Sequence, residues 1–141
     1  MLMQVADSQL KELGVETTTE IVDNIDTTAA KGDYDIIFYA QHTAPTGNPS
    51  FFLNQFFRTD GGKNFNHYDS EELNTILDEM GDVGNGAELD TLAVDAQSVI
   101  YKDLPVLFLV DPQWHIAVSE DLRDYQPYGG DYYIVNDQLG L

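Results

Sequence analysis

The sequence predicts an α/β fold in which a mixed sheet is flanked by helices. Two apolar runs, residues 34–40 and 106–110, contain only one charged residue between them, Asp35. Runs of this kind are typical of strands that are covered on both faces. Segments with helical spacing of apolar residues lie before and between the two runs. An alternation of helices with strands is the pattern of α/β domains.

Two further segments are predicted to join this sheet. Residues 15–21 alternate between apolar or β-branched and polar side chains, which is typical of a half-buried strand, and residues 114–118 form another candidate strand. Residues 119–141 are polar, aromatic and rich in turn-forming residues, so we expect an irregular C-terminal tail. Because no long linker divides the 141 residues, we predict a single domain.

The spacing of apolar residues predicts five helices. The first is expected to end at Gly14, a residue type that favours the left-handed conformation after a helix. Asp69, with Glu72 three residues later, is expected to form the N-cap of the fourth helix. The fifth is the longest and carries an apolar stripe along one face. The predicted helices cover residues 2–13, 24–32, 50–57, 70–80 and 87–103.

The composition is strongly acidic. Asp and Glu number 25 against six Lys and Arg, which gives a net charge of −19. Such a surface repels nucleic acid and anionic lipid, so a nucleic-acid partner is excluded. We interpret the even scarcity of basic residues as a sign of a halophilic source, because high salt screens repulsion to within a few Å. The absence of cysteine excludes disulfides and thiolate metal sites.

No segment of the sequence is typical of membrane insertion or of export. No run approaches the roughly 18 apolar residues of a membrane span. Residues 1–13 carry neither a basic start nor a cleavage site, so no signal peptide is predicted here. We therefore expect either a chain that stays where it is made or a piece of a longer exported protein.

Several short motifs occur in this sequence in an order that is found in one protein family. The sequence Gly-Asp-Tyr-Asp at 32–35 enters the first apolar run, and a Pro-containing loop at 44–49 leads into a short apolar helix. A Gly-Asn-aromatic loop then ends in Tyr at position 68, and Asp-Leu-Pro-Val at 103–106 leaves the last helix. Over residues 4–125 this order resembles the C-terminal lobe of family 5 solute-binding proteins of ABC importers, the oligopeptide, dipeptide and nickel binders.

The resemblance implies a type II periplasmic-binding-protein-like lobe and a role without catalysis. The full protein is then expected to contain an N-terminal lobe that is missing here and to close its two lobes around a peptide or a small chelate. It would deliver this ligand to the ABC permease subunits, at the extracellular face of the membrane or in the periplasm. Lobe closure would be stabilised by the ligand's higher affinity for the closed state.

Polar and aromatic residues in the two loops are the candidate ligand-binding residues. Amide, imidazole and hydroxyl groups just past the first apolar run suit peptide backbone atoms or carboxylates of a chelate. The same residue types also shape turns in the absence of any ligand. The candidates are Tyr39, Gln41, His42, Thr43, Asn48, Asn64, Phe65 and Tyr68.

Three alternatives are weaker. A direct nickel site is disfavoured, because the nickel-binding branch has His where this chain has Tyr39, and the three histidines have no helical i,i+4 spacing. An enzyme is disfavoured, since no nucleophile elbow, Walker loop or His-Glu-x-x-His motif occurs, and no metal or cofactor is predicted. A free-standing acidic interaction domain without a ligand cleft stays open as an alternative to the importer receptor.

Overall fold

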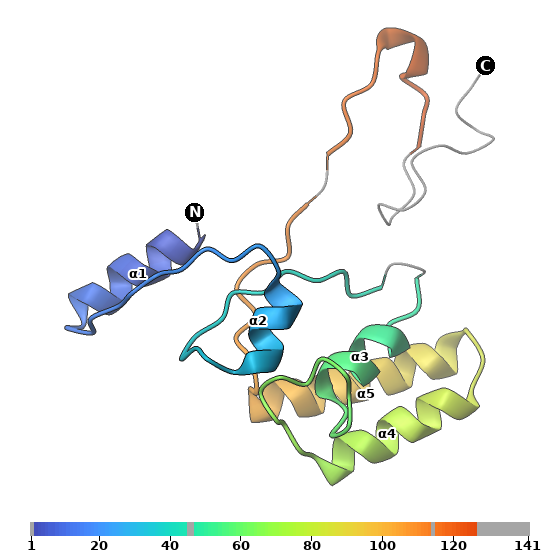
Figure 1. The fold of residues 1–141 in the computed structure, drawn as a ribbon. Coiled ribbons are helices and arrows are strands. Elements are labelled where there is room, and N and C mark those ends of the chain that lie inside the picture. The colour runs from blue at the N-terminus through green and yellow to red at the C-terminus, as the bar shows by residue number, and fades with distance from the viewer. Residues whose placement is uncertain (1, 45–46, 114, 127–141) are drawn as a thin grey trace. The chain divides into compact units, whose positions relative to one another are not determined.

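The computed structural model describes residues 2–44, 47–113 and 115–126. The chain divides into two compact units, Met1–Gln41 and His42–Leu141. The first unit contains helices α1 (Leu2–Glu12) and α2 (Ile25–Lys31), and the second contains α3 (Ser50–Phe57), α4 (Glu71–Asp82) and α5 (Ala87–Asp103) (Figure 1). Helices α1, α3, α4 and α5 match their predicted ranges to within two residues at each end. Helix α2 lies inside its predicted range, 24–32.

The core of the second unit is a three-helix cluster. Helices α4 and α5 are joined by residues 83–86 and pack along each other, and α3 packs against both (Figure 1). The predicted apolar stripes of α4 and α5 face inward, so the helical periodicity identified this core correctly. Its buried residues are Leu53, Phe57, Leu73, Leu77, Met80, Leu89, Ala93, Ala96, Val99 and Ile100.

The ends of α4 and α5 have specific local causes. Ser70, not Asp69, is the N-cap of α4: its hydroxyl accepts a hydrogen bond from the Leu73 backbone N–H at 3.2 Å. The predicted cap was therefore wrong by one residue, and the Asp69 carboxylate instead accepts a bond from the Thr59 hydroxyl. At the end of α5, Leu104 adopts a left-handed conformation with φ of 49°. Pro105 follows and lacks the N–H that a continuing helix needs.

The first unit has almost no core. Among its described residues Ala29 alone is buried, and α1 buries no side chain. Its order comes from local contacts. Asn24 caps α2 through the Thr27 N–H, and Gly32 ends that helix in the left-handed conformation. In α1, the Asp7 carboxylate accepts a hydrogen bond from Lys11, and this bond lowers the pKa of the carboxyl. A second bond, donated by the Thr17 hydroxyl, lowers the pKa further.

The predicted α/β fold class was wrong. None of the described residues forms a strand or a sheet, so the segments 15–21, 34–40 and 106–110 are irregular and do not pair with one another. A strand is stabilised by its neighbours through backbone hydrogen bonds and cross-strand packing, and isolated strands are not stable. Apolar, β-branched composition was present in these segments, but the partners were not. Of the fourth segment, 114–118, residue 114 lies outside the described residues.

The end of the chain is described only in part. Residues 119–126 contain one short 3-10 turn, η1 (Glu120–Leu122), and residues 127–141 lie outside the described part. Within the described residues, no helix has the length and apolar character required to cross a membrane.

Candidate ligand-binding loops

The loop between α3 and α4 is built directly on the end of α3. Gly61 donates its N–H to the Arg58 carbonyl at 2.8 Å, and Lys63 donates to the Gln55 carbonyl at 2.9 Å, so the last carbonyls of α3 are satisfied by the loop. The loop passes so close that a Cβ on Gly61 would lie 2.5 Å from the Asn54 carbonyl oxygen. Only glycine fits this approach.

Asn64 holds the rest of this loop in place. Its Nδ2 group donates to the Tyr68 carbonyl at 2.7 Å, to the Arg58 carbonyl at 3.1 Å and to the Thr59 carbonyl at 3.3 Å. Its Oδ1 atom accepts from the Tyr68 N–H at 2.9 Å. The side chain is 8% exposed. Its polar atoms are therefore all engaged by the backbone, and none faces an open site for a ligand.

Tyr68 connects the loop to the end of α5. Its hydroxyl donates to the Asp103 carboxylate at 2.6 Å, while Asn66 Nδ2 donates to the Pro105 carbonyl at 2.9 Å. Partial burial raises the pKa of the Tyr68 phenol, and the bond to Asp103 adds to this shift. Phe65, which precedes Asn66, is half-buried. The hydroxyl of Tyr68 is thus engaged with Asp103, and the residue is half-buried against the helical core.

The second predicted loop lies at the other end of α5. Asn48 donates from Nδ2 to the Asn85 Oδ1 atom at 2.8 Å, and its own Oδ1 accepts from the Ser50 N–H. Before it, His42 is half-buried and Thr43 is exposed, while Pro45 and Thr46 lie outside the described residues. Asn85 was not a predicted site residue, and no local sequence signal distinguishes it from other loop asparagines.

The structure separates the candidate residues into groups. Within the second unit, Asn48 contacts the loop before α5 and Tyr68 contacts its last residue. Because α5 has 17 residues, about 25 Å at 1.5 Å per residue separates these two points. Tyr39 and Gln41 belong to the first unit, where the Tyr39 hydroxyl donates to the Asp26 carboxylate. The eight candidates therefore do not form one pocket within the second unit.

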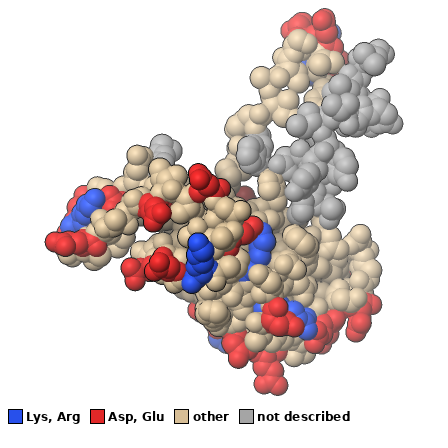
Figure 2. Space-filling model, viewed as in Figure 1, with Lys and Arg blue, Asp and Glu red and all other residues tan. Residues whose placement is uncertain are grey.

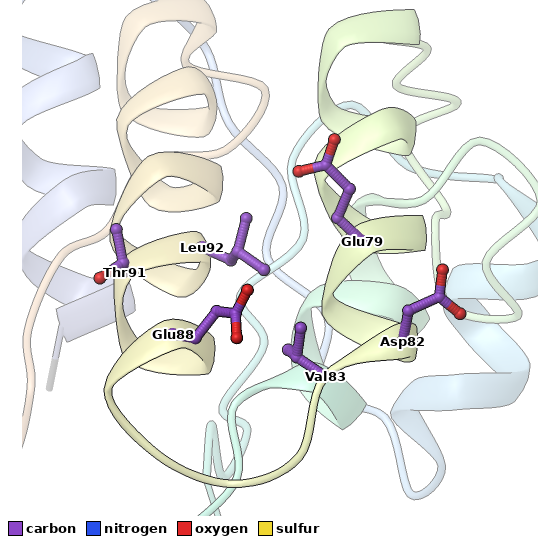
Figure 3. A pocket seen from close by; sticks show the side chains of 6 residues that line it. All are labelled: Glu79, Asp82, Val83, Glu88, Thr91 and Leu92. Atoms are coloured by element: carbon purple, nitrogen blue, oxygen red, sulfur yellow. The ribbon is translucent and has the colours of Figure 1, made fainter.

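A shallow cleft that the sequence did not indicate lies between α4 and α5. It has a volume of about 420 Å³ (Figure 3). Glu79 and Glu88 flank it from the two helices, Leu92 lies between them, and Asp82 points away from α5. No three His, Asp or Glu side chains of the described residues come together as a metal site, and these carboxylates are no exception.

Carboxylates are spread over the described surface. Figure 2 shows Asp and Glu at many places on the visible face, with fewer Lys and Arg among them. Arg58 is one of the few paired cations that link elements: it bonds to Asp78 of α4 at 2.6 Å and to Asp60 at 3.1 Å. The bond to Asp78 raises the pKa of the Arg58 guanidinium. No part of this face is marked as a site by acidity alone.

Comparison with known proteins gives one similarity. The chain is 20% identical over 136 residues to the nickel-binding protein NikA of Staphylococcus aureus (strain NCTC 8325 / PS 47). The aligned region is 96% of this chain but 28% of NikA, so the chain spans less than a third of that relative's length. No family model and no solved structure matches the chain. The similarity agrees with the resemblance noted in the sequence, whose family includes nickel binders.

Proposed function

We propose that this chain is part of the solute-binding subunit of an ABC importer. The observation that carries the proposal is the similarity to NikA, which extends over 136 residues and almost the whole of this chain. The ordered motifs at 32–35, 44–49, 62–68 and 103–106 agree with this similarity. The subunit would bind its ligand and deliver it to a membrane permease, with no catalysis of its own.

A peptide-like ligand is our first candidate. Gln41, His42 and Thr43 are consecutive in the chain, and their amide, imidazole and hydroxyl groups are of the types that bind peptide backbone groups. Asn64 contributes to loop structure in this proposal and not to the ligand. Phe65 and Tyr68 are half-buried in the loop between α3 and α4 and are not part of the site proposed at residues 41–43.

A nickel chelate is the second candidate, and the name of the relative favours it. No cluster of three potential metal ligands occurs among the described residues. A chelate brings most of its own metal ligands, so it needs mainly hydrogen-bond donors from the protein. The same segment, 41–43, would then bind carboxylates of the chelate in place of a peptide.

The rest of the binding site is expected on other parts of a longer protein. Since this chain corresponds to 28% of NikA, the second lobe, the hinge and the contacts with the permease would lie outside it. A site with one wall loses most of the contacts that immobilise a ligand. We therefore expect the chain alone to bind ligand only weakly, with a dissociation constant on the order of 1 mM or higher.

NMR titration of the ¹⁵N-labelled chain tests this proposal at such affinities. A mixture of tri- and tetrapeptides, and separately a nickel–histidine chelate, would be added up to about 10 mM. We expect amide shifts at residues 41–44 and no shifts along α5. His42→Ala should weaken the response, whereas His115→Ala, an exposed histidine outside the loop, should not.

The outcomes separate the candidates. A response to the chelate and not to peptides selects the second ligand class. The absence of any response to both probes, or equal loss of response in His42→Ala and His115→Ala, contradicts the proposed site.

A further inference from the structure

The connection between α4 and α5 contains the sequence Asn85-Gly86, which is the single Asn-Gly pair in the 141 residues. Asparagine is one of the thermolabile residue types of proteins. Its side-chain amide can be attacked by the backbone nitrogen of the next residue, and a glycine at that position has no Cβ to obstruct the approach. The sequence therefore places the most reactive asparagine of the chain in this connection.

The structure leaves this pair open. Both residues are exposed and lie in the turn directly before the first residue of α5. The Gly86 N–H donates no hydrogen bond to any described residue. A Cβ placed on Gly86 would meet no atom within 4 Å, so the space around the glycine is free. The attacking nitrogen is thus accessible, and no hydrogen bond to a described residue has to break first.

A related pair, Asp60-Gly61, is protected by the fold. Aspartate can also cyclise onto a following glycine, but here the Gly61 N–H is donated to the Arg58 carbonyl at 2.8 Å. The Asp60 carboxylate accepts a bond from Arg58 Nε at 3.1 Å. A Cβ on Gly61 would lie 2.5 Å from the Asn54 carbonyl oxygen, so the space is already filled. The two pairs therefore share one chemistry and differ in how the structure exposes it.

Asn48 is bonded to Asn85 in a way that favours reaction at Asn85. The Asn48 Nδ2 group donates to the Asn85 Oδ1 atom at 2.8 Å. Negative charge develops on this oxygen when the amide carbon is attacked, and a hydrogen-bond donor at that atom stabilises the charge. Asn48 itself cannot react in the same way, because the next residue is Pro49, whose nitrogen carries no hydrogen.

We propose that Asn85 is a modification site, at which the asparagine converts spontaneously to aspartate and isoaspartate. The Gly86 nitrogen loses its proton to hydroxide and forms a bond to Cγ of Asn85. The bond from Cγ to Nδ2 breaks, and Nδ2 takes a proton from water and leaves as ammonia. The product is a five-membered succinimide. Water then adds to one of the two ring carbonyl carbons and breaks its bond to nitrogen. Addition at Cγ gives aspartate, and addition at the backbone carbon gives isoaspartate.

The two products differ in their effect on the contact with Asn48. An aspartate at position 85 keeps an acceptor for Asn48 and adds one negative charge to a chain of charge −19. This charge lies beside the N-terminus of α5, where the helix dipole favours it. An isoaspartate adds one methylene to the backbone and removes it from the side chain, so its acceptor withdraws from Asn48. Isoaspartate therefore breaks the contact, whereas aspartate retains it.

Peptide mapping by mass spectrometry tests the proposal on the full chain. The folded chain and the chain unfolded in guanidinium chloride are incubated side by side at mildly alkaline pH. We expect conversion at Asn85 to be at least about tenfold faster than at other asparagines. Unfolding should change this rate by less than about threefold, but should accelerate isomerisation at Asp60 at least about tenfold. Conversion raises the peptide mass by about 1 Da, and electron-transfer fragmentation distinguishes the two isomers.

Matched variants assign the reaction to Asn85. In Asn85→Gln, cyclisation requires a six-membered ring, so the acidic form seen by ion exchange should decrease at least about tenfold. Asn66→Gln changes another exposed asparagine and should leave the acidic form unchanged. The purified isoaspartate fraction should melt below Asn85→Asp, since the contact with Asn48 is lost only in the former. Equal rates at all asparagines overturn the proposal, as does conversion at Asn85 that occurs in guanidinium chloride and not in the folded chain.

Discussion

Replacing Asn64 by Ala should destabilise the second unit by about 3 kcal/mol. The amide supplies two N–H groups to three carbonyls and one acceptor to the Tyr68 N–H, which amounts to three effective hydrogen bonds. Each such bond contributes about 1 kcal/mol net, and buried partners left unsatisfied cost more. With 8% of Asn64 exposed, water cannot replace these bonds without opening the loop.

Two further variants make the test sharper. Asn64→Asp keeps the size of the side chain and one acceptor, but it directs a second oxygen and a negative charge at three carbonyls. It should therefore lower the free energy of unfolding by more than Asn64→Ala does. Asn66→Ala removes one bond from an exposed side chain and should cost at most about 1 kcal/mol.

Urea unfolding followed by circular dichroism measures all three variants. A free energy of unfolding for Asn64→Ala within about 0.5 kcal/mol of that of the unmodified chain would contradict this role of Asn64. So would a higher stability of Asn64→Asp than of Asn64→Ala. A variant that keeps its stability and loses only ligand response would return Asn64 to the group of ligand-binding residues.

Three other predictions concern two glycines, the Tyr68 phenol and the net charge of the chain. Gly61→Ala should destabilise by about 1–3 kcal/mol because of the clash with the Asn54 carbonyl, whereas Gly81→Ala, inside α4 with open space, should stabilise by up to about 1 kcal/mol; thermal unfolding compares them. Since the Tyr68 pKa is raised above 10.0, stability should be full below pH 10 and fall as pH rises through the folded value, and Tyr68→Phe should remove this component of an alkaline titration. Because the charge is −19, the melting temperature should rise from about 0.1 to about 1 M NaCl, and an unchanged value would contradict the proposed salt adaptation.

Helices were predictable because their signals are local. The stripe on α5, the glycine after α1 and the apolar segment 50–57 are each contained within a few turns of a single helix. Strands were not predictable, because a strand is stable only when it is paired, and its partner cannot be identified from the local sequence. Residues 106–110 have the composition of a buried strand, but no described residue pairs with them.

The candidate site was predictable by residue type and not by position. Loop asparagines, histidines and aromatic residues were singled out because they carry hydrogen-bonding and apolar groups. Whether an Asn holds a loop or faces a ligand depends on which carbonyls the folded chain brings to it, as Asn64 illustrates. Asn48 and Tyr68 are likewise separated because they contact opposite ends of α5, and no local pattern in the sequence encodes these contacts.

The distribution of buried residues also determines when the chain can fold during synthesis. The first 41 residues leave the ribosome with a single buried side chain, Ala29, among those described. Helix α3 follows, but Leu53 and Phe57 are buried in a cluster whose other buried members belong to α4 and α5. Because Ile100 completes that cluster, no stable core exists until about residue 103 has emerged. During synthesis, the apolar side chains of α3 and α4 therefore stay accessible to chaperones and proteases until α5 has emerged to cover them.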